Sequence, residues 1–161
     1  MMISQTARII RRLISTLVIA AMVGCASQAP STSSSTAKPA KSADQAVSVA
    51  LQQLGVPYRY GGSTPSGFDC SGLVYYSYSR AGIDLPRTTG ALWSNMRPVS
   101  KGEVQVGDIL FFRIAGKMSH VGMYIGNEQF VHAPSSGKVV TIASLRSDFY
   151  SDALIRAGRP N

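Results

Sequence analysis

The hydrophobic pattern of the chain changes its period near Val104, from the spacing of helices to the spacing of strands. Before this point, apolar residues recur at helical intervals, as in Val47, Ala50, Leu51 and Leu54. After it, short alternating segments are separated by Gly, Asn, Pro and Ser, and we expect strands over 109–113, 118–125, 129–133, 138–142 and 153–157. Helices first and strands afterwards predict an α+β domain, with the helices packed on one side of an antiparallel sheet.

Three residues have the side chains and the sequence context of helix N-caps: Ser42, Asp69 and Thr88. Ser42 is followed three residues later by Gln45, which is the pattern of a capping box. The helix that starts after Asp69 should continue to Ala81. We therefore expect three helices before the strands begin.

The first 24 residues have the order of an export signal. Arg8, Arg11 and Arg12 precede an apolar run of eleven residues over 13–23. A transmembrane helix needs about 20 apolar residues, so this run is too short to span a bilayer. We expect residues 1–24 to be removed by cleavage before Cys25.

The residues around this cleavage point resemble the lipobox of bacterial lipoproteins. The motif here is Met22-Val23-Gly24-Cys25, with methionine where leucine is usual. The resemblance implies acylation of Cys25, palmitate included, and a lipid anchor in the membrane. Ala26 stands where an aspartate would retain the protein at the inner membrane, so the expected place is the outer membrane, facing the periplasm. The alternative is an ordinary signal peptide with an incidental cysteine.

Residues 25–43 are rich in Ser, Ala and Pro, with no large apolar side chain to bury. Such a segment cannot offset its ordering entropy, and we expect a flexible tether ahead of a folded domain over 44–161. The net charge of +8 includes three arginines of the signal, which leaves 13 basic against 8 acidic residues. No basic stripe with interleaved aromatic residues is present in the sequence, so no nucleic-acid partner is expected.

A glycine-rich loop breaks into a helix at Gly67-Phe68-Asp69-Cys70-Ser71-Gly72-Leu73. Cys70 is expected in the first helical turn, where unpaired N–H groups and the helix dipole favour a thiolate and lower the pKa of a thiol. A nucleophilic cysteine needs a base and a group that orients this base. The two histidines of the chain, His120 and His132, both fall in predicted strands and are the candidates.

The positions of these histidines require a particular hairpin register. Side chains alternate between the faces of a strand, so a two-residue turn at 126–127 would place the two imidazoles on opposite faces. A three-residue loop over 126–128, or an equivalent bulge, places Gly122 opposite His132 and both histidines on one face. We predict this register, with space for the imidazole at Gly122 and backbone strain at Glu128 or Asn127.

Six short motifs occur in order along the chain: 58–62 (Tyr-Arg-Tyr-Gly-Gly), 67–73, 85–88 (Leu-Pro-Arg-Thr), 107–108 (Gly-Asp), 120–122 (His-Val-Gly) and 130–133 (Phe-Val-His-Ala). Together they resemble the NlpC-type family of papain-like cell-wall cysteine endopeptidases, in its small lipoprotein members, over residues 44–161. The resemblance implies that Cys70 is the nucleophile, His120 the general base and His132 the residue that orients the base.

The same resemblance implies the substrate and the remaining site residues. The substrate would be a peptidoglycan stem peptide, cleaved either between D-glutamate and the diamino acid or at the crosslink between the diamino acid and D-alanine. Tyr58 would join the Cys70 N–H in an oxyanion hole, and Asp69, Ser71 and Arg87 would line the substrate side. No metal or organic cofactor is implied, and the resemblance names no regulatory protein partner.

Several alternatives remain open. A Cys70–His120–His132 zinc site would form an open catalytic centre, although the chain lacks a closely spaced ligand pair. In the alternative interpretation, Asp69 is a helix cap without a role in substrate binding, and Arg87 is a solvated loop residue. The domain can also be a catalytically idle wall-binding lipoprotein, or an acyltransferase or amidase that uses the same triad.

Overall fold

The computed structural model describes residues 37–161, with side chains from Ser42 onward. The predicted export signal, Cys25 and the first part of the predicted tether lie outside the described residues. Within residues 37–161, no helix is both long and apolar enough to cross a membrane.

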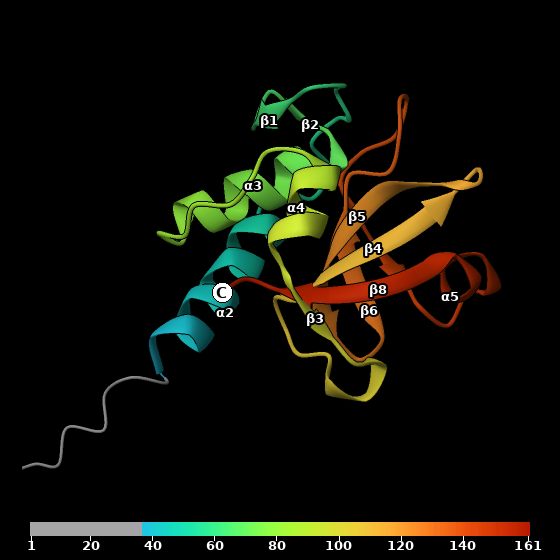
Figure 1. Ribbon diagram of the computed structural model, residues 1–161. Helices are drawn as coiled ribbons and strands as arrows, with labels where there is room; N and C mark the ends of the chain where they lie inside the picture. The colour runs from blue at the N-terminus through green and yellow to red at the C-terminus, as the bar shows by residue number, and fades with distance from the viewer. Residues whose placement is uncertain (1–36) are drawn as a thin grey trace, which may run out of the picture. The chain divides into compact units, whose positions relative to one another are not determined.

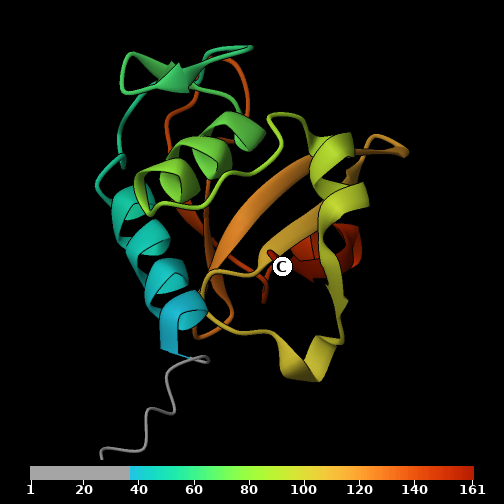
Figure 2. The same ribbon diagram turned by 60° about the vertical axis from the view of Figure 1, so that its left-hand side comes forward.

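Three helices lie on one side of a larger sheet: α2 (Ala37–Leu51), α3 (Cys70–Arg80) and α4 (Thr89–Asn95) (Figure 1). A further short helix, α5 (Asp148–Ala153), lies beyond the opposite side of the sheet, and the sequence pattern did not predict it. Figure 2 shows α2 and α3 side by side in front of the strands. The predicted α+β class, with N-terminal helices on one side of the sheet, is confirmed.

The start of α2 differs from the prediction. The helix begins at Ala37 rather than after Ser42, so residues 37–43 belong to the helix and the predicted tether over 25–43 extends too far. Alanine and lysine in this segment favour helix. Pro39 falls in the first turn, where its missing N–H costs no helical hydrogen bond.

The sheet has six antiparallel strands in the order β3-β8-β4-β5-β6-β7. They are β3 (Arg97–Val99), β4 (Ile109–Ile114), β5 (Lys117–Gly126), β6 (Gln129–His132), β7 (Thr141–Ser144) and β8 (Leu154–Arg159). A separate two-stranded sheet joins β1 (Ser63–Thr64) to β2 (Gly67–Phe68), and a 3-10 turn, η1, spans Lys101–Glu103. The five predicted strands are all found, whereas β1, β2 and β3 were not predicted.

The strand predicted over 138–142 begins further along the chain, as β7, because residues 138–140 have other hydrogen-bond partners. Residues 138–140 exchange hydrogen bonds with the segment after α2: the Tyr58 N–H donates to the Lys138 carbonyl, and Val140 and Val56 also pair. These backbone groups are therefore occupied, and the sheet strand starts at Thr141.

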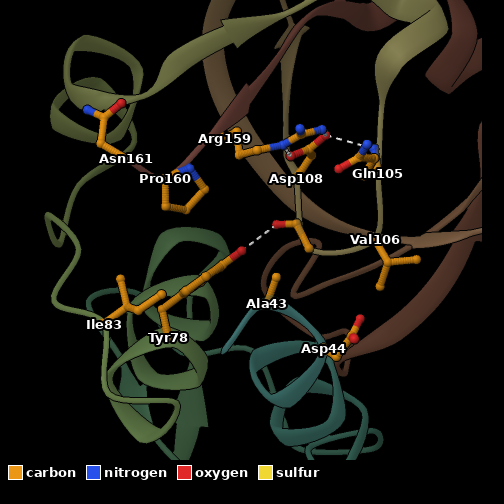
Figure 3. Close-up of a pocket in the computed structure, with 11 residues that line it drawn as sticks. Ala43, Asp44, Tyr78, Ile83, Gln105, Val106, Asp108, Arg159, Pro160 and Asn161 are labelled. Atoms are coloured by element: carbon orange, nitrogen blue, oxygen red, sulfur yellow. Dashed lines mark hydrogen bonds and ion pairs between the residues drawn. The ribbon is translucent and has the colours of Figure 1, made fainter. Parts of the chain in front are cut away.

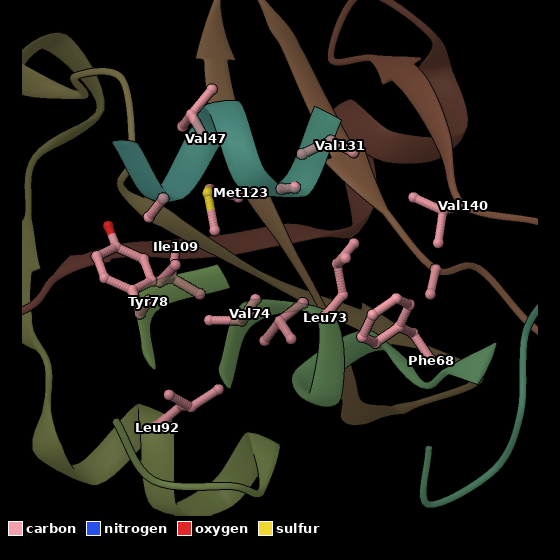
Figure 4. Close-up of a cluster of buried hydrophobic side chains, with 14 of the residues drawn as sticks. Val47, Phe68, Leu73, Val74, Tyr78, Leu92, Ile109, Met123, Val131 and Val140 are labelled. Carbon is pink, nitrogen blue, oxygen red and sulfur yellow. The ribbon is translucent and has the colours of Figure 1, made fainter. Parts of the chain in front are cut away.

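The core has two parts, one on each side of the sheet. The larger part packs the three N-terminal helices against the sheet, and Figure 4 shows Val47, Leu73, Val74, Met123 and Val131 converging there. The second part lies under α5 and joins these residues: Leu110, Phe112, Phe130, Ala153 and Ala157. Consecutive residues of β4 and β5 therefore face different parts of the core.

Helix α3 has the predicted ends. The Asp69 carboxylate caps it by accepting from the Gly72 N–H at 2.6 Å. At the other end, Gly82 follows the C-cap Ala81 with a φ of +79°. Val74 and Ser77 are buried on the face that continues from Cys70. The first turn of α3 is thus held by the packed face behind it.

The β5–β6 hairpin has the predicted register, which a bulge produces. Met123 pairs with Val131 and Tyr124 with Phe130. If the same register continues by one residue, Gly122 lies opposite His132. The register then shifts before Gly126, and Asn127 and Glu128 have φ values of +52° and +56°. The predicted strain therefore falls on both turn residues, in the combination of a type I′ turn.

The predicted reason for a glycine at 122 was wrong. A Cβ atom there would lie 2.5 Å from a ring carbon of Phe130, so the space belongs to the phenyl ring and not to the imidazole of His132.

Replacing Glu128 by glycine should stabilise the fold, because glycine adopts positive φ without the steric cost that other residues meet. Glu128→Gly removes the ion pair with Arg146, but both partners are exposed, at 57% and 74%, and such a pair contributes little. We expect a gain of about 1 kcal/mol in the free energy of unfolding, measured by urea titration. Glu128→Gln, which loses the charge but keeps the strain, is the control, and an equal gain in both variants would contradict the interpretation.

Candidate active site

The side chain of Cys70 lines a cleft of about 450 Å³ beside the start of α3. Five of the predicted site residues line this cleft: Tyr58, Asp69, Cys70, Ser71 and Arg87. Its other walls come from Tyr60, Gly61, Thr88, Thr89 and Ser119. Every lining residue except Gly61 and Cys70 has an oxygen or nitrogen atom in its side chain, and no Val, Leu, Ile or Met side chain is among them.

The Cys70 sulfur has two oxygen neighbours. Its Sγ lies 3.9 Å from the Thr89 Oγ1 and 4.0 Å from the carbonyl oxygen of Ser119. Burial raises the pKa of the Cys70 thiol, and the Asp69 charge adds to this, although the Val121 backbone and the Thr89 hydroxyl act in the opposite direction. The predicted lowering of the thiol pKa is therefore wrong for this structure, because burial outweighs the helix start.

His120 and His132 form a buried hydrogen-bonded pair, with 2.8 Å between His120 Nε2 and His132 Nδ1. Only 5% of His120 and 1% of His132 is exposed. Burial lowers the pKa of His120 to about 4, and burial together with the neighbouring His120 lowers that of His132 to about 3. Both imidazoles are therefore neutral near pH 7, and the prediction that they share one face is confirmed.

Aromatic rings enclose the histidine pair. Phe112 and Phe130 of the sheet pack against His120 and His132, with ring centroids 5.9 Å and 4.9 Å apart respectively. Tyr150 of α5 meets the His132 ring edge-on at 5.5 Å. The unpredicted helix α5 thus supplies part of the apolar surroundings that keep the pair uncharged.

The structure places the Cys70 thiol against the strand that carries His120, the expected base, without a direct bond between the two side chains. Within residues 42–161, no hydrogen bond joins Cys70 to His120, and the sulfur instead meets the carbonyl of Ser119, the preceding residue. Catalytic hydrogen bonds are often long before substrate binds. Because Nε2 of His120 is engaged with His132, Nδ1 is the nitrogen left to take a proton from Cys70.

Asp69, Ser71 and Arg87 are joined in a network that builds the helix start. Arg87 donates to both carboxylate oxygens of Asp69, at 2.9 and 2.8 Å, and to Ser71 Oγ and the Gly62 carbonyl, each at 3.0 Å. Burial alone would raise the pKa of Asp69, but Arg87 and the N–H groups of Gly72 and Gly61 hold it below its ordinary value. The interpretation of Arg87 as a solvated loop residue is wrong, since its guanidinium binds Asp69.

The two tyrosines of the cleft differ in exposure. Tyr58 is half-buried, and burial, with the charges of Cys70 and Asp69, raises the pKa of its hydroxyl. The hydroxyl therefore stays protonated and can donate a hydrogen bond, as an oxyanion hole requires. Tyr60 is 90% exposed at the rim of the cleft.

Five residues that line the cleft were not among the predicted site residues: Tyr60, Gly61, Thr88, Thr89 and Ser119. Thr89 follows directly after a motif that was identified, and its place beside Cys70 could have been suspected from that motif. Nothing in the sequence marks Ser119, because its contribution is a backbone carbonyl.

A second cavity, of about 340 Å³, lies near the other end of α3 (Figure 3). Three of its polar side chains have partners: the buried Tyr78 hydroxyl donates to the Gly107 carbonyl at 2.6 Å, and Arg159 binds Asp108 at 2.7 Å. No cysteine or histidine is among the residues that line it. This cavity therefore offers no thiol and no imidazole, the two groups that a cysteine peptidase uses.

The zinc alternative gains no geometric support. Across the part of the chain that the structure describes, no three Cys, His, Asp or Glu side chains are grouped so that they could hold a metal ion. Instead, Nε2 of His120 and Nδ1 of His132 share a hydrogen bond, so neither of these nitrogens is available to a metal ion.

Comparison with known proteins identifies the family. Residues 55–159 match the model of the NlpC/P60 family. The chain belongs to this family. The papain-like fold expected from the sequence is thereby confirmed, and the chemistry of the cleft can be considered in that context.

Among curated proteins, the chain is similar to murein DD-endopeptidase MepH of Escherichia coli, with 40% identity over 129 residues, which cover 76% of this chain and 48% of MepH. It is also similar to a probable endopeptidase p60 of Listeria seeligeri, with 37% identity over 113 residues, covering 70% of this chain and 21% of that protein. The chain therefore spans about half of one relative and about a fifth of the other.

Among solved structures, an NlpC/P60 family protein from Bacillus cereus is similar, with a TM-score of 0.69 and 35% identity, over 73% of this chain and 39% of that one. The NlpC/p60 domain of the peptidoglycan hydrolase SagA has a TM-score of 0.63 and 33% identity, over 72% of this chain and 97% of that domain. The isolated SagA domain thus corresponds to most of the described residues.

The histidine pair makes stability depend on pH. In the folded protein, the pKa values of about 4 and about 3 lie below the ordinary value of 6.5, so only the unfolded chain takes up protons at intermediate pH. The free energy of unfolding is therefore unaffected by protonation of these histidines above pH 6.5. It decreases as pH falls toward 4, by up to about 3 kcal/mol for His120 alone.

We therefore expect Tm to fall between about pH 7 and about pH 5, and to fall less in His132→Asn, where one titrating group is removed and the amide oxygen can still accept from His120. Calorimetry over this range measures both. An identical fall in the two proteins would show that other groups cause the loss.

Proposed function

We propose that this protein is a cysteine endopeptidase that hydrolyses amide bonds in peptidoglycan stem peptides. The observation that carries the proposal is the Cys70 thiol at a helix start, in an open cleft, against the strand that bears the His120–His132 pair. The names of the relatives, murein DD-endopeptidase and probable endopeptidase p60, support the same activity.

The first half of the reaction forms a thioester. His120 Nδ1 accepts the thiol proton as Sγ attacks the amide carbonyl, and the resulting oxyanion receives hydrogen bonds from the Cys70 N–H and the Tyr58 hydroxyl. The C–N bond then breaks, and His120 returns the proton to the leaving amine. The acyl group is now bound to Cys70, and the amine product can leave.

The second half consumes one water molecule. His120 takes a proton from this water as its oxygen attacks the thioester, and the C–S bond breaks with the proton returned to sulfur. The products are a free carboxylic acid and the regenerated thiol. The chain's own residues account for each proton in this scheme.

His132 fixes the tautomer of the base. For His120 to accept at Nδ1, its Nε2 must carry the hydrogen and donate it to Nδ1 of His132 across the 2.8 Å contact. His132 then carries its own hydrogen on Nε2. A neutral imidazole thus orients His120, in the position where papain-like enzymes also use other hydrogen-bond acceptors.

The crosslink between the diamino acid and D-alanine is the favoured bond, because the relative MepH is named a DD-endopeptidase. The bond between D-glutamate and the diamino acid is the competing choice. Mass spectrometry of products from purified crosslinked muropeptides distinguishes them, since only crosslink cleavage converts a dimer into two monomers with complete stem backbones. The cleft has no Val, Leu, Ile or Met side chain among its lining residues, so it is less suited to an acyltransferase for lipid chains.

Cys70→Ser should lose at least about 1,000-fold in turnover of crosslinked muropeptides, because a serine hydroxyl is far less acidic than a thiol. The fold should persist, since the two side chains are similar in size. Ser79→Ala, an exposed change on the same helix, is the matched control and should keep wild-type activity. Substantial turnover by Cys70→Ser would reject the nucleophile and with it the proposed mechanism, whereas an active Ser79→Ala and an inactive, folded Cys70→Ser would exclude the idle wall-binding protein.

We further propose that acylated Cys25 anchors the protein in the outer membrane, facing the periplasm, with peptidoglycan within reach of the cleft. The lipobox resemblance at 22–25 and Ala26 support this location. Cys25→Ala should move the protein from the membrane fraction to the soluble fraction after cell breakage, as an immunoblot would show. Retention of Cys25→Ala in the membrane fraction would argue against a lipid anchor, and Ser33→Ala, outside the lipobox, serves as the control.

A further inference from the structure

The two oxygen atoms beside the Cys70 sulfur have different hydrogen-bonding capacities. The Ser119 carbonyl oxygen, 4.0 Å from Sγ, can only accept. The Thr89 Oγ1, 3.9 Å from Sγ, can either donate or accept. The protonation state of the sulfur therefore decides which of these neighbours stabilises it.

The neutral thiol has a hydrogen that it can donate to Ser119. Once the proton has left, the same carbonyl dipole points its negative end at a negatively charged sulfur and becomes unfavourable. The Thr89 hydroxyl can rotate to donate its hydrogen to the thiolate. A charge-assisted hydrogen bond is shorter and stronger than a neutral one, so the 3.9 Å separation can tighten in the charged state.

Thr89 is held in this place by the start of α4, which Arg87 links to the start of α3 that holds Cys70. It is the first residue of α4, directly after the N-cap Thr88, whose Oγ1 accepts from the Ala91 N–H at 3.3 Å. The residue before this cap, Arg87, is bound to Asp69 and Ser71 on either side of Cys70 in the chain. The nucleophile and the threonine hydroxyl are therefore fixed by one network.

The buried histidine pair increases the need for such a donor. Burial disfavours the charged form of both His120 and His132, so the transfer of the thiol proton to His120 is costly and gains from a second group that stabilises the thiolate. Among the side chains that line the cleft, Thr89 is the one with a hydrogen bond to the sulfur.

We propose that Thr89 is a further catalytic residue, whose hydroxyl donates a hydrogen bond to the Cys70 thiolate while His120 removes the thiol proton. The threonine keeps its own proton throughout; the thiol proton passes to His120 Nδ1, and the electron pair remains on sulfur for the attack. This inference rests on the proposed function of Cys70 as the nucleophile.

The test measures the thiolate directly, without substrate. The rate of Cys70 alkylation by iodoacetamide is followed against pH in the full-length protein, by mass spectrometry of the peptide that contains Cys70, so that Cys25 does not interfere. Thr89→Val removes the hydroxyl but keeps the shape, and Thr89→Ser restores the hydroxyl. Ser94→Ala removes an exposed hydroxyl on the same helix, which bonds only to the Gly90 carbonyl among the described contacts, and is the matched control.

We expect the pH midpoint of alkylation to rise by about one unit in Thr89→Val, with an alkylation rate near pH 8 that is about tenfold lower. Thr89→Ser should lie close to wild type, and Ser94→Ala should be unchanged. An unchanged midpoint in Thr89→Val overturns the proposal. Equal shifts in Thr89→Val and Thr89→Ser also overturn it, since they would reflect packing around the threonine methyl group and not the hydroxyl.

Turnover of muropeptides separates the two proposals. For Thr89→Val, kcat should fall about tenfold with little change in KM, because the hydrogen bond to sulfur becomes strong only as the proton leaves. Full activity of Thr89→Val together with an inactive Cys70→Ser rejects the role of Thr89 alone. Wild-type activity of Cys70→Ser rejects the proposed function itself.

Discussion

The ion pair between Arg87 and Asp69 is the interaction on which the site depends. Both carboxylate oxygens bind the guanidinium, and one of them also caps α3 through the Gly72 N–H. The same guanidinium binds the Gly62 carbonyl, which ties the glycine-rich loop to the helix start. With Asp69 14% exposed and Arg87 31% exposed, the pair is partly shielded from solvent and keeps its geometry better than a surface pair would. It sets the position of Cys70, the proposed nucleophile, forms one wall of the cleft and places Thr89 beside the sulfur.

Burial determines the protonation states around this framework. It raises the pKa of the Cys70 thiol and lowers those of His120 and His132, so the resting centre holds a neutral thiol and neutral imidazoles. A preformed thiolate–imidazolium pair is therefore not favoured in this structure. Proton transfer at the moment of attack fits better, because the proposed oxyanion hole and the proposed hydrogen bond from Thr89 would then stabilise charge as it develops.

The sheet contributes through the alternation of its side chains. The register of β5 and β6 brings His120 and His132 to one face, where Phe112, Phe130 and Tyr150 surround them. The neighbouring Val121 and Met123 face the helices and belong to the larger part of the core. Strand β5 thus packs against the N-terminal helices through one face and carries His120, the proposed base, on the other. The bulge between Tyr124 and Gly126, followed by the turn at Asn127 and Glu128, sets the register that makes this possible.

The sequence by itself determined what depends on local patterns. The period change near Val104 predicted the α+β class, the caps Asp69 and Thr88 predicted two helix starts, and side-chain parity predicted the register around His132. Tertiary structure decided what depends on neighbours distant in the chain: the pairing of 138–140 with 55–58, the partner of Arg87, the covering of His132 by Tyr150 and the contact of Thr89 with Cys70. It also reversed the predicted shift of the thiol pKa. Helix caps and strand alternation are properties of a few consecutive residues, whereas burial and long-range hydrogen bonds exist only after the chain has brought remote segments together.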